Sequence, residues 1–285
     1  MKYVLAVILF ILMPLSVSAA VLSVTTDPKE IGIGNVAQIT VSVSSETSVN
    51  TFSGTLLYPK DLLEPLLISD GNSIVPLWIK RPEDASGSIS FAGVTPGGFV
   101  GENGKIFSVI FRAKTAGKAA FTLTDSHVLL SDGSGTEAST TQTSVALSIS
   151  ASPGNTYVIE QDATPPQPFE INVQSGPDGK KYAIFAAVDK GSGVKRYEAS
   201  ESRFSSNKTV WLPAESPYLL PDQELTSDIY IRAVDNMGNV RTEELLRENI
   251  LRKNEEAGVI ALAVLLGLMG GYLLLRPKRN KIIPV

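Results

Sequence analysis

The sequence predicts an all-β protein in which two β-sandwich domains precede a single transmembrane helix. Short stretches that alternate between apolar and polar residues recur through residues 21–149, and Gly, Pro, Asn, Asp and Ser occupy the breaks between them. This pattern is typical of antiparallel strands packed around one core. No convincing amphipathic helix interrupts it. Near the C-terminus, residues 257–275 form a long apolar run without charge, close to the roughly 20 residues with which a helix crosses a bilayer.

The pattern is clearest in residues 87–114. One side of the stretch 107–113 is apolar and is predicted to form a wall of the core, because successive strand side chains point to opposite faces. That side consists of Phe107, Val109, Phe111 and Ala113. The other side mixes apolar and polar residues, which indicates a face that is partly covered. Ile89 and Phe91 show the same alternation, and a loop with five glycines is predicted to separate the two strands.

The first domain is predicted over residues 21–150. Its other strands are residues 36–43, 52–58, 78–79, 121–123 and 145–149. In the second of these, one alternating set is predicted to face the core: Phe52, Gly54, Leu56 and Tyr58. Because the strand period is two, the opposite set must face outward. That outward set is Thr51, Ser53, Thr55 and Leu57.

The order of these motifs resembles that of the cohesin domain. The matching pieces are AQITVSVS after the Gly34 turn, FSGTLLYPKDLLEP, GSISFAG, GKIFSVIFRAK and FTLTDSHVLLSDGSG. Tyr58, Pro59 and Leu62 match the tyrosine, the proline-bearing turn and the leucine that end the third strand of cohesins. The resemblance implies a jelly-roll β-sandwich, similar in fold to carbohydrate-binding modules, that binds calcium-loaded dockerin modules of polysaccharide-degrading assemblies.

The same resemblance implies where the partner lies. In the cohesin family the dockerin covers the outward face of the third strand, which corresponds here to Thr51, Ser53, Thr55 and Leu57. Dockerin-binding cohesins tend to carry Asn and Asp at outward positions of this strand, whereas the matching residues here are Thr51, Ser53 and Thr55. The identity of the partner therefore stays open at this point.

A linker and a second domain follow the first. Closely spaced prolines in residues 151–168 favour an extended chain and predict a proline-rich linker. Residues 169–243 again contain short strands, and the segments DKGSGVKRYE and IYIRAVDNMGNVR resemble Ig-like or fibronectin-III-like modules of bacterial surface proteins. That resemblance implies a spacer. Residues 244–256 are highly charged and are interpreted as a stalk.

The N-terminus carries the pattern of a secretory signal peptide. Lys2 is followed by an apolar run and then by small residues up to Ala20, which predicts a signal peptide over residues 1–20 with cleavage after Ala19 or Ala20. An uncleaved N-terminal membrane helix is the alternative, although the apolar run is short for a span.

The C-terminus carries the pattern of a membrane anchor. Residues 257–275 are predicted to form a transmembrane helix, and four basic residues lie in the tail, residues 276–285. The positive-inside rule places this tail in the cytoplasm. We therefore expect a single-pass protein of the cell membrane whose two domains lie outside the cell.

Charge and cysteine content exclude several classes of function. Outside residues 21–256 lie Lys2 and the four basic residues of the tail, so that segment keeps 20 basic and 29 acidic residues and a net charge of −9. Such an acidic segment argues against nucleic acid as a partner. The absence of cysteine excludes disulfides, thiol catalysis and cysteine-ligated metals.

The sequence offers few residues for catalysis, and we predict no enzyme activity, no cofactor and no metal. His127 is the only histidine, which excludes a multi-histidine metal site, and no Gly-x-Ser-x-Gly motif is present. Asp70, Asp125 and Asp132 are weak calcium candidates because the Asp-x-Asp-x-Asp-Gly spacing is missing. A second acidic set is interpreted in the same way, with turn caps preferred: Asp189, Asp235 and Asn236.

Three functions remain open. The leading hypothesis is a surface protein whose cohesin-like domain binds a dockerin-type protein module through Thr51, Ser53, Thr55 and Leu57. The resemblance implies a link to polysaccharide degradation. The second is direct carbohydrate binding, in which Trp78 is the candidate for stacking on a sugar ring. The third is a purely structural component of the cell envelope.

Overall fold

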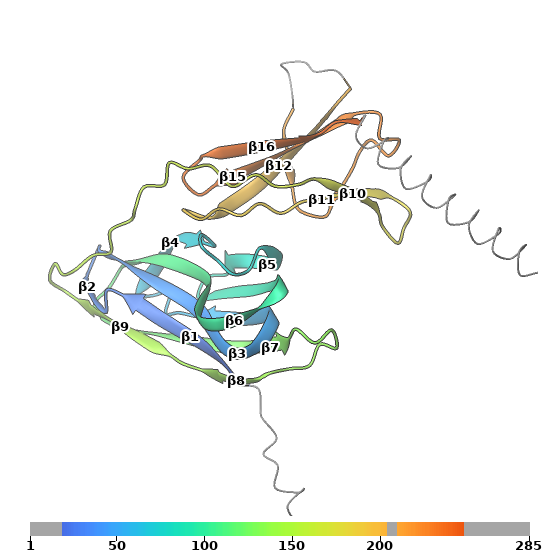
Figure 1. Ribbon diagram of the computed structural model, residues 1–285. Helices are drawn as coiled ribbons and strands as arrows, with labels where there is room; N and C mark the ends of the chain where they lie inside the picture. Colours follow the sequence, from blue (N-terminus) through green and yellow to red (C-terminus); the bar gives the residue numbers. More distant parts are fainter. Residues whose placement is uncertain (1–18, 204–209, 248–285) are drawn as a thin grey trace, which may run out of the picture. The chain divides into compact units, whose positions relative to one another are not determined.

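The computed structural model describes residues 19–203 and 210–247 (Figure 1). The chain divides into two compact units. The first contains the chain up to Phe169 together with the loops Ala186–Arg196 and Ala233–Arg241, and the second contains Glu170–Phe185, Tyr197–Arg232 and the chain from Thr242. All named elements of the described residues are β-strands, as the sequence predicts.

Nine strands build the β-sandwich of the first unit. They are β1 (Ala19–Asp27), β2 (Glu30–Gly32), β3 (Val36–Leu57), β4 (Leu63–Ser69), β5 (Leu77–Asp84), β6 (Ser88–Ala113), β7 (Gly117–Leu130), β8 (Ser139–Gln142) and β9 (Val145–Ser150). Two of them, β3 and β6, are long and pair with each other along most of their length. The first half of β3 also pairs with β1, and its second half pairs with β7. β3 and β6 therefore contribute to both layers of the sandwich (Figure 1).

The predicted inward and outward phases are confirmed in both long strands. In the first half of β3 the apolar alternate residues are fully buried: Ala37, Ile39, Val41 and Val43. In the last part of β6, Phe107, Val109, Phe111 and Ala113 are at most 2% exposed. The opposite side of this part of β6 is also covered, as its mixed composition indicates, since Ile106, Ser108 and Ile110 are buried.

The predicted separation of these strands is wrong in two places. Residues 36–43 and 52–58 were expected as two strands, but they are continuous in β3, whose register against β6 shifts several times between Val41 and Thr51. The glycine-rich loop likewise lies inside β6. Gly97 and Gly98 have φ of 84° and 79°, a region that glycine enters without steric cost. These irregularities bend the ladder without ending it, because hydrogen-bonded pairing resumes on both sides.

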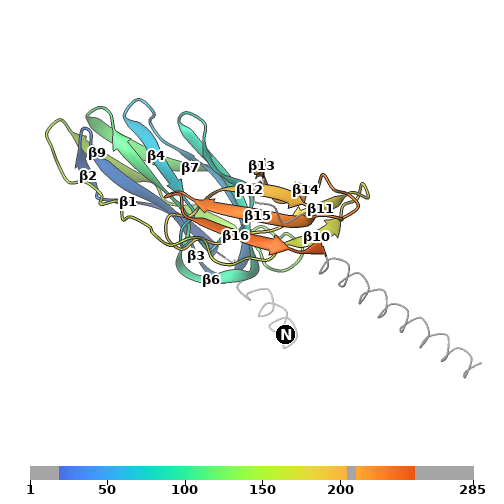
Figure 2. The ribbon, with the colours of Figure 1, turned by 90° about the horizontal axis from the view of Figure 1, so that it is seen from above.

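The strands after the linker form two further antiparallel sheets. They are β10 (Asn172–Ser175), β11 (Lys181–Ile184), β12 (Val194–Ser202), β13 (Leu212–Ala214), β14 (Tyr218–Leu219), β15 (Asp228–Asp235) and β16 (Val240–Leu245). The order is β10-β11-β14 in the three-stranded sheet and β13-β12-β15-β16 in the four-stranded sheet (Figure 2). Buried residues of the second unit include Ala183, Phe185, Tyr197, Ile229 and Ile231.

The terminal predictions fall mainly outside the described residues. Nearly all of the predicted signal peptide and the whole of residues 257–275 lie there. Within residues 19–203 and 210–247, no helix is long and apolar enough to span a membrane.

Candidate functional site

The candidate binding face is formed by the outward side chains of the second half of β3. Phe52, Leu56 and Tyr58 are buried, and Gly54 lies between them on the same side. The four opposite residues alternate with them. Thr51, Ser53 and Thr55 are half-buried and Leu57 is 38% exposed. The strand therefore presents three small hydroxyl residues and one exposed apolar side chain at the surface.

Strands β6 and β7 extend this surface on both sides. Residues paired across a ladder carry their side chains on the same face. From β6 the face gains Ser88, Ser90, Ala92 and Val94, and from β7 it gains Thr122, Thr124, His127 and Leu129. We call these eight residues together with Thr51, Ser53, Thr55 and Leu57 the β3 face. It combines small hydroxyl groups, four apolar side chains and one imidazole, and none of its twelve residues is a carboxylate.

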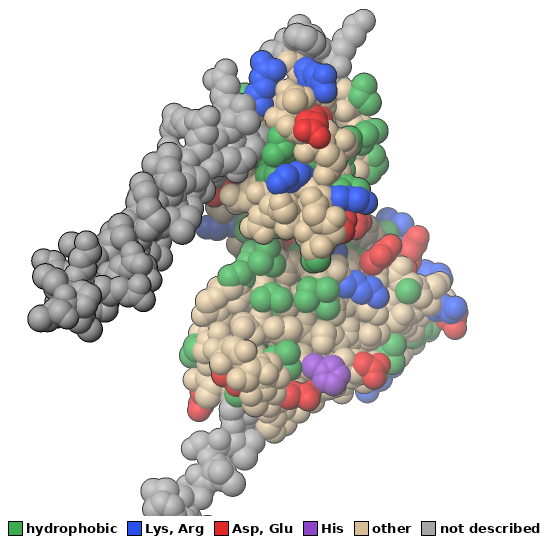
Figure 3. All heavy atoms as spheres, turned by 90° about the vertical axis from the view of Figure 1, so that its right-hand side faces the viewer, with side chains coloured by type: hydrophobic (Ala, Val, Ile, Leu, Met, Phe, Trp, Pro, Cys, Tyr) green, Lys and Arg blue, Asp and Glu red, His purple; other side chains and the backbone are tan. Residues whose placement is uncertain are grey.

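Hydrogen bonds order parts of the β3 face. The hydroxyl groups of Thr55 and Ser90 lie 3.1 Å apart and bond across the ladder. At the border of the face, Nδ1 of His127 lies 2.7 Å from Oε1 of Glu137. Figure 3 shows charged side chains of both signs interspersed over one view of the molecule, with the histidine at the surface. The β3 face is thus weakly polar, and its imidazole, His127, already has Glu137 as a partner.

The sequence identified the β3 part of this face but missed the parts on β6 and β7. The alternation of residues 88–91 placed Ser88 and Ser90 on one side of a strand, but nothing local showed that this strand lies beside β3. The β7 side is harder to foresee because the register shifts between Ser53 and Thr55. Asp125, at the irregularity in β7, has a φ of 48°.

Trp78, the candidate for carbohydrate stacking, lies on the opposite side of the sheet. It pairs with Gly93, a buried position of β6, and is partly buried against the core. A Cβ added at Gly93 would lie 3.0 Å from Cε3 of the Trp78 ring. The indole Nε1 donates a hydrogen bond of 2.9 Å to Asp70 Oδ2, which also accepts one of 2.6 Å from Arg81. The Trp78 side chain is therefore engaged in contacts within the protein, and it is not part of the β3 face.

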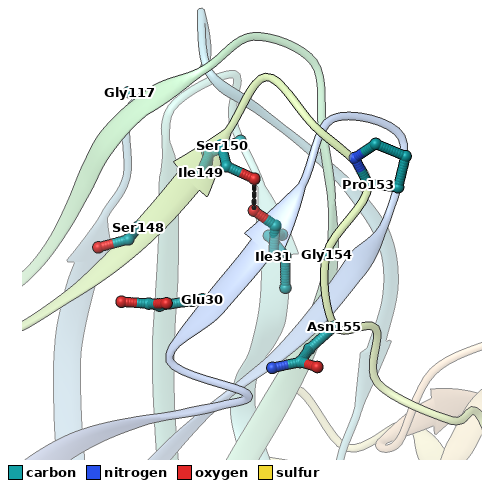
Figure 4. A pocket seen from close by; sticks show the side chains of 9 residues that line it. All are labelled: Glu30, Ile31, Gly117, Ser148, Ile149, Ser150, Pro153, Gly154 and Asn155. Carbon is teal, nitrogen blue, oxygen red and sulfur yellow. Dashed lines mark hydrogen bonds between the residues drawn. The ribbon is translucent and has the colours of Figure 1, made fainter.

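A separate pocket of about 660 Å³ lies where β2 and β9 run in parallel. Figure 4 shows Ser150 directed toward the carbonyl oxygen of Ile31, and the two oxygens lie 3.4 Å apart. Glu30 is the only ionisable residue among the nine that line the pocket. A lone carboxylate cannot provide the paired acid and base of a hydrolytic site, so the pocket supports no enzyme assignment.

The calcium candidates of the first domain are not assembled. The structure does not group Asp70, Asp125 and Asp132; in the described part of the chain the grouped acidic residues are Asp162, Asp189 and Asp235. Asp189 and Asp235 do act as turn caps, as the sequence indicates. Asp189 accepts the amide of Gly191, and Asp235 accepts that of Met237.

The sequence matches no family model and no curated protein. Solved structures that resemble the chain are cohesin domains. The non-cellulosomal cohesin of the archaeon Archaeoglobus fulgidus is 19% identical, with 46% of this chain and 91% of that chain covered and a TM-score of 0.40. The seventh ScaB type I cohesin of Pseudobacteroides cellulosolvens is 15% identical, with 49% of this chain and 97% of that chain covered and a TM-score of 0.41. The sixth cohesin of scaffoldin B of Acetivibrio cellulolyticus was solved in complex with a dockerin. It is 17% identical, with 45% of this chain and 98% of that chain covered and a TM-score of 0.38.

Proposed function

We propose that the first unit is a cohesin-like module that binds a protein module of the dockerin type on the β3 face. The observation that carries this proposal is the exposed Leu57 at the end of a row of half-buried hydroxyl residues, on a face built from three adjacent strands. The motif order of the sequence agrees with it. A flat sheet face of this kind suits another folded module better than a small ligand, which needs a concave site.

The chemistry of the β3 face sets the expected energetics. A single apolar side chain surrounded by small groups can fill a pocket of the partner and contribute a disproportionate share of the binding energy. The face carries no carboxylate, so long-range attraction of a basic partner contributes little. We therefore expect the affinity to depend only weakly on salt concentration.

The test is to measure binding of calcium-loaded dockerin modules to the full chain by surface plasmon resonance. Leu57→Asp and Thr55→Arg place a charge in the contact and should each abolish binding, because the charge would lose its water without a partner. The melting temperature should stay nearly unchanged. Val158→Asp is the matched control, because Val158 is 75% exposed and lies in no strand of the sheet that carries the β3 face. Undiminished binding by both face variants would refute the assignment.

Direct carbohydrate binding is the competing function, and a substitution at Trp78 distinguishes it from dockerin binding. A polysaccharide pull-down that succeeds with the full chain and fails with Trp78→Ala would favour this function. The packing of the Trp78 indole against the core and its hydrogen bond to Asp70 argue against carbohydrate binding, because stacking on a sugar needs a free ring face. Failure with both dockerins and polysaccharides would leave the purely structural role in the cell envelope.

We further infer that the protein is a non-enzymatic surface protein held in the cell membrane by residues 257–275, with its described units outside. The strands after the linker would serve as an Ig-like spacer. Protease added to intact cells should release the bulk of the protein; complete protection would contradict this topology.

Between the two predicted cleavage positions, the fold favours cleavage after Ala19. Ala20 is fully buried in the first unit and pairs with Ser45 of β3. Cleavage after Ala20 would remove this residue from the strand. N-terminal sequencing of the mature protein should therefore begin at Ala20.

A further inference from the structure

Three aspartates from distant parts of the sequence meet in the first unit. Asp162 precedes the linker prolines, Asp189 lies in the loop Ala186–Arg196, and Asp235 ends β15. One carboxylate oxygen of each lies within 4.8 Å of those of the other two. Asp189 and Asp235 are only 3% and 0% exposed. Two of the three carboxylates are therefore removed from water while they face like charges.

Backbone amides fix the positions of these carboxylates. Oδ1 of Asp189 accepts the N–H of Gly193 at 2.7 Å, and Oδ1 of Asp235 accepts that of Asn239 at 2.7 Å. Asp162 Oδ2 accepts the N–H of Ser192 at 2.8 Å.

The cluster has no compensating positive charge. In residues 19–203 and 210–247, none of the three forms an ion pair with Lys, Arg or His. The Thr164 hydroxyl holds the pKa of Asp162 down at about 2, so this carboxylate is ionised at neutral pH. Burial raises the pKa of Asp189, and the charges of Asp162 and Asp235 raise it further. Uncompensated carboxylates at this distance destabilise a fold, and a bound cation removes that cost.

A second feature points to a ligand at the same place. Ser192 is 7% exposed, and its buried Oγ has no hydrogen-bond partner. Its amide N–H donates a hydrogen bond of 2.8 Å to Oδ2 of Asp162, so Ser192 lies directly against the cluster. A buried hydroxyl without a partner costs free energy unless something else uses its lone pairs.

We propose that Asp162, Asp189, Asp235 and the hydroxyl oxygen of Ser192 bind one calcium ion. The four groups offer only oxygen ligands, and Ca²⁺ takes six to eight of these in a flexible geometry, whereas Mg²⁺ demands a strict octahedron. Water can complete the shell. The ion ties the chain before the linker prolines to two loops of the same unit. This site lies away from the β3 face and does not depend on the proposed function.

The first test is calcium binding by the full chain after treatment with a chelator. Isothermal titration should show uptake of one Ca²⁺ per chain, with Mg²⁺ much weaker. At a Ca²⁺ concentration of 100 times Kd, the melting temperature should rise by about 5 to 10 °C. No heat and no thermal shift at millimolar Ca²⁺ would overturn the proposal.

The second test separates a calcium ligand from a plain turn cap. Asp189→Asn should lower the melting temperature in Ca²⁺ but leave it equal or higher in chelator, where it relieves repulsion. Asp222→Asn is the matched control. Asp222 also caps a turn, accepting the amide of Thr226 and the hydroxyl of Ser227, but belongs to no acidic group of the described residues. This control should lower stability equally with and without Ca²⁺, and the same behaviour in Asp189→Asn would refute the site.

Ser192→Ala keeps the test decisive if Asp189→Asn does not fold. The Ser192 hydroxyl has no hydrogen-bond partner within residues 19–203 and 210–247, so its removal should leave the melting temperature in chelator unchanged. Its loss as a ligand should weaken calcium binding about tenfold. An unchanged calcium affinity would remove Ser192 from the site and, together with a silent Asp162→Asn variant, would reject calcium binding here.

Discussion

The cores of the two units use different kinds of contact. In the first unit, Phe111 packs between Tyr58 and Phe121, with ring centroids 4.7 Å and 5.4 Å away. A further ring pair, Phe91 with Phe107, lies in the same core at 5.1 Å. The core of the first unit thus contains two groups of packed aromatic rings, which the alternation in β3, β6 and β7 directs inward.

The second unit combines a smaller apolar core with partly buried charges. One ring pair in this unit is Phe185 and Tyr197, whose ring centroids lie 5.0 Å apart. Beside it, the guanidinium of Arg232 lies 3.9 Å from the ring centre of Trp211 and 3.3 Å from a carboxylate oxygen of Glu198. Buried Oε1 of Glu201 has no hydrogen-bond partner. The difference teaches that aromatic rings pack against one another in the sandwich core of the first unit, whereas the second unit places charged groups beside its rings.

The largest expected effect is that of Phe111→Ala. The ring is fully buried, and its truncation should destabilise the first unit by about 3 to 5 kcal/mol. Hydrogen exchange measured by mass spectrometry should show loss of protection in β3, β6 and β7, with peptides of the second unit unchanged. Ile79→Ala, at a 75% exposed position, is the control and should have almost no effect. Equal loss of protection in both units would show that their cores do not behave separately.

A smaller effect is expected from Gly93→Ala, which tests close packing at the edge of the same core. The added Cβ would lie 2.3 Å from Cγ1 of Val75 and 3.0 Å from the carbonyl oxygen of Leu77, so the chain must shift. We expect a loss of about 1 to 3 kcal/mol by thermal unfolding. The neighbouring outward substitution Ala92→Ser should be nearly neutral, and a similar loss from both changes would mean that the assignment of faces in β6 is wrong.

A pH-dependent effect is expected at Tyr58 in the first unit. Burial raises the pKa of this phenol to about 12, and the hydrogen bond of 2.5 Å to Asp84 raises it as well. Because the folded pKa exceeds the unfolded value of about 10, the stabilisation is fully present below pH 10 and is lost as the pH rises toward 12. Tyr58→Phe should cost about 0.5 to 1.5 kcal/mol at pH 7.

The loss of stability between pH 10 and 12 should be smaller in Tyr58→Phe than in the parent protein, as measured by denaturant unfolding at each pH. Parallel pH curves for the two proteins would contradict the raised pKa of Tyr58.

The smallest effect is expected from Glu201→Gln in the second unit. Burial raises the pKa of Glu201, so the stability linked to this group is present at acidic pH and is lost as the pH rises through its folded pKa. The amide removes the charge and keeps an acceptor for the amide of Asp222. The variant should therefore melt slightly higher than the parent at pH 7, and this gain should vanish at acidic pH. A gain that is independent of pH would point to a different cause.

Local sequence patterns were sufficient to predict which side of each strand faces the core. The alternation in residues 107–113 identified the buried rings of Phe107 and Phe111, and the alternation in residues 52–58 identified Leu57 as outward. The reason is that the direction of a strand side chain is set by the backbone pleat, which depends only on neighbouring residues. The same local logic identified Asp189 and Asp235 as turn caps.

Only the tertiary structure decided which segments lie side by side. The union of two predicted strands into β3, the place of His127 beside Ser53 and the held position of Trp78 all depend on hydrogen-bonded register between distant segments. The convergence of Asp162 with Asp189 and Asp235 has the same origin. A period-two pattern fixes a face but not a neighbour, because many registers would bury the same apolar residues and only the whole ladder selects one of them.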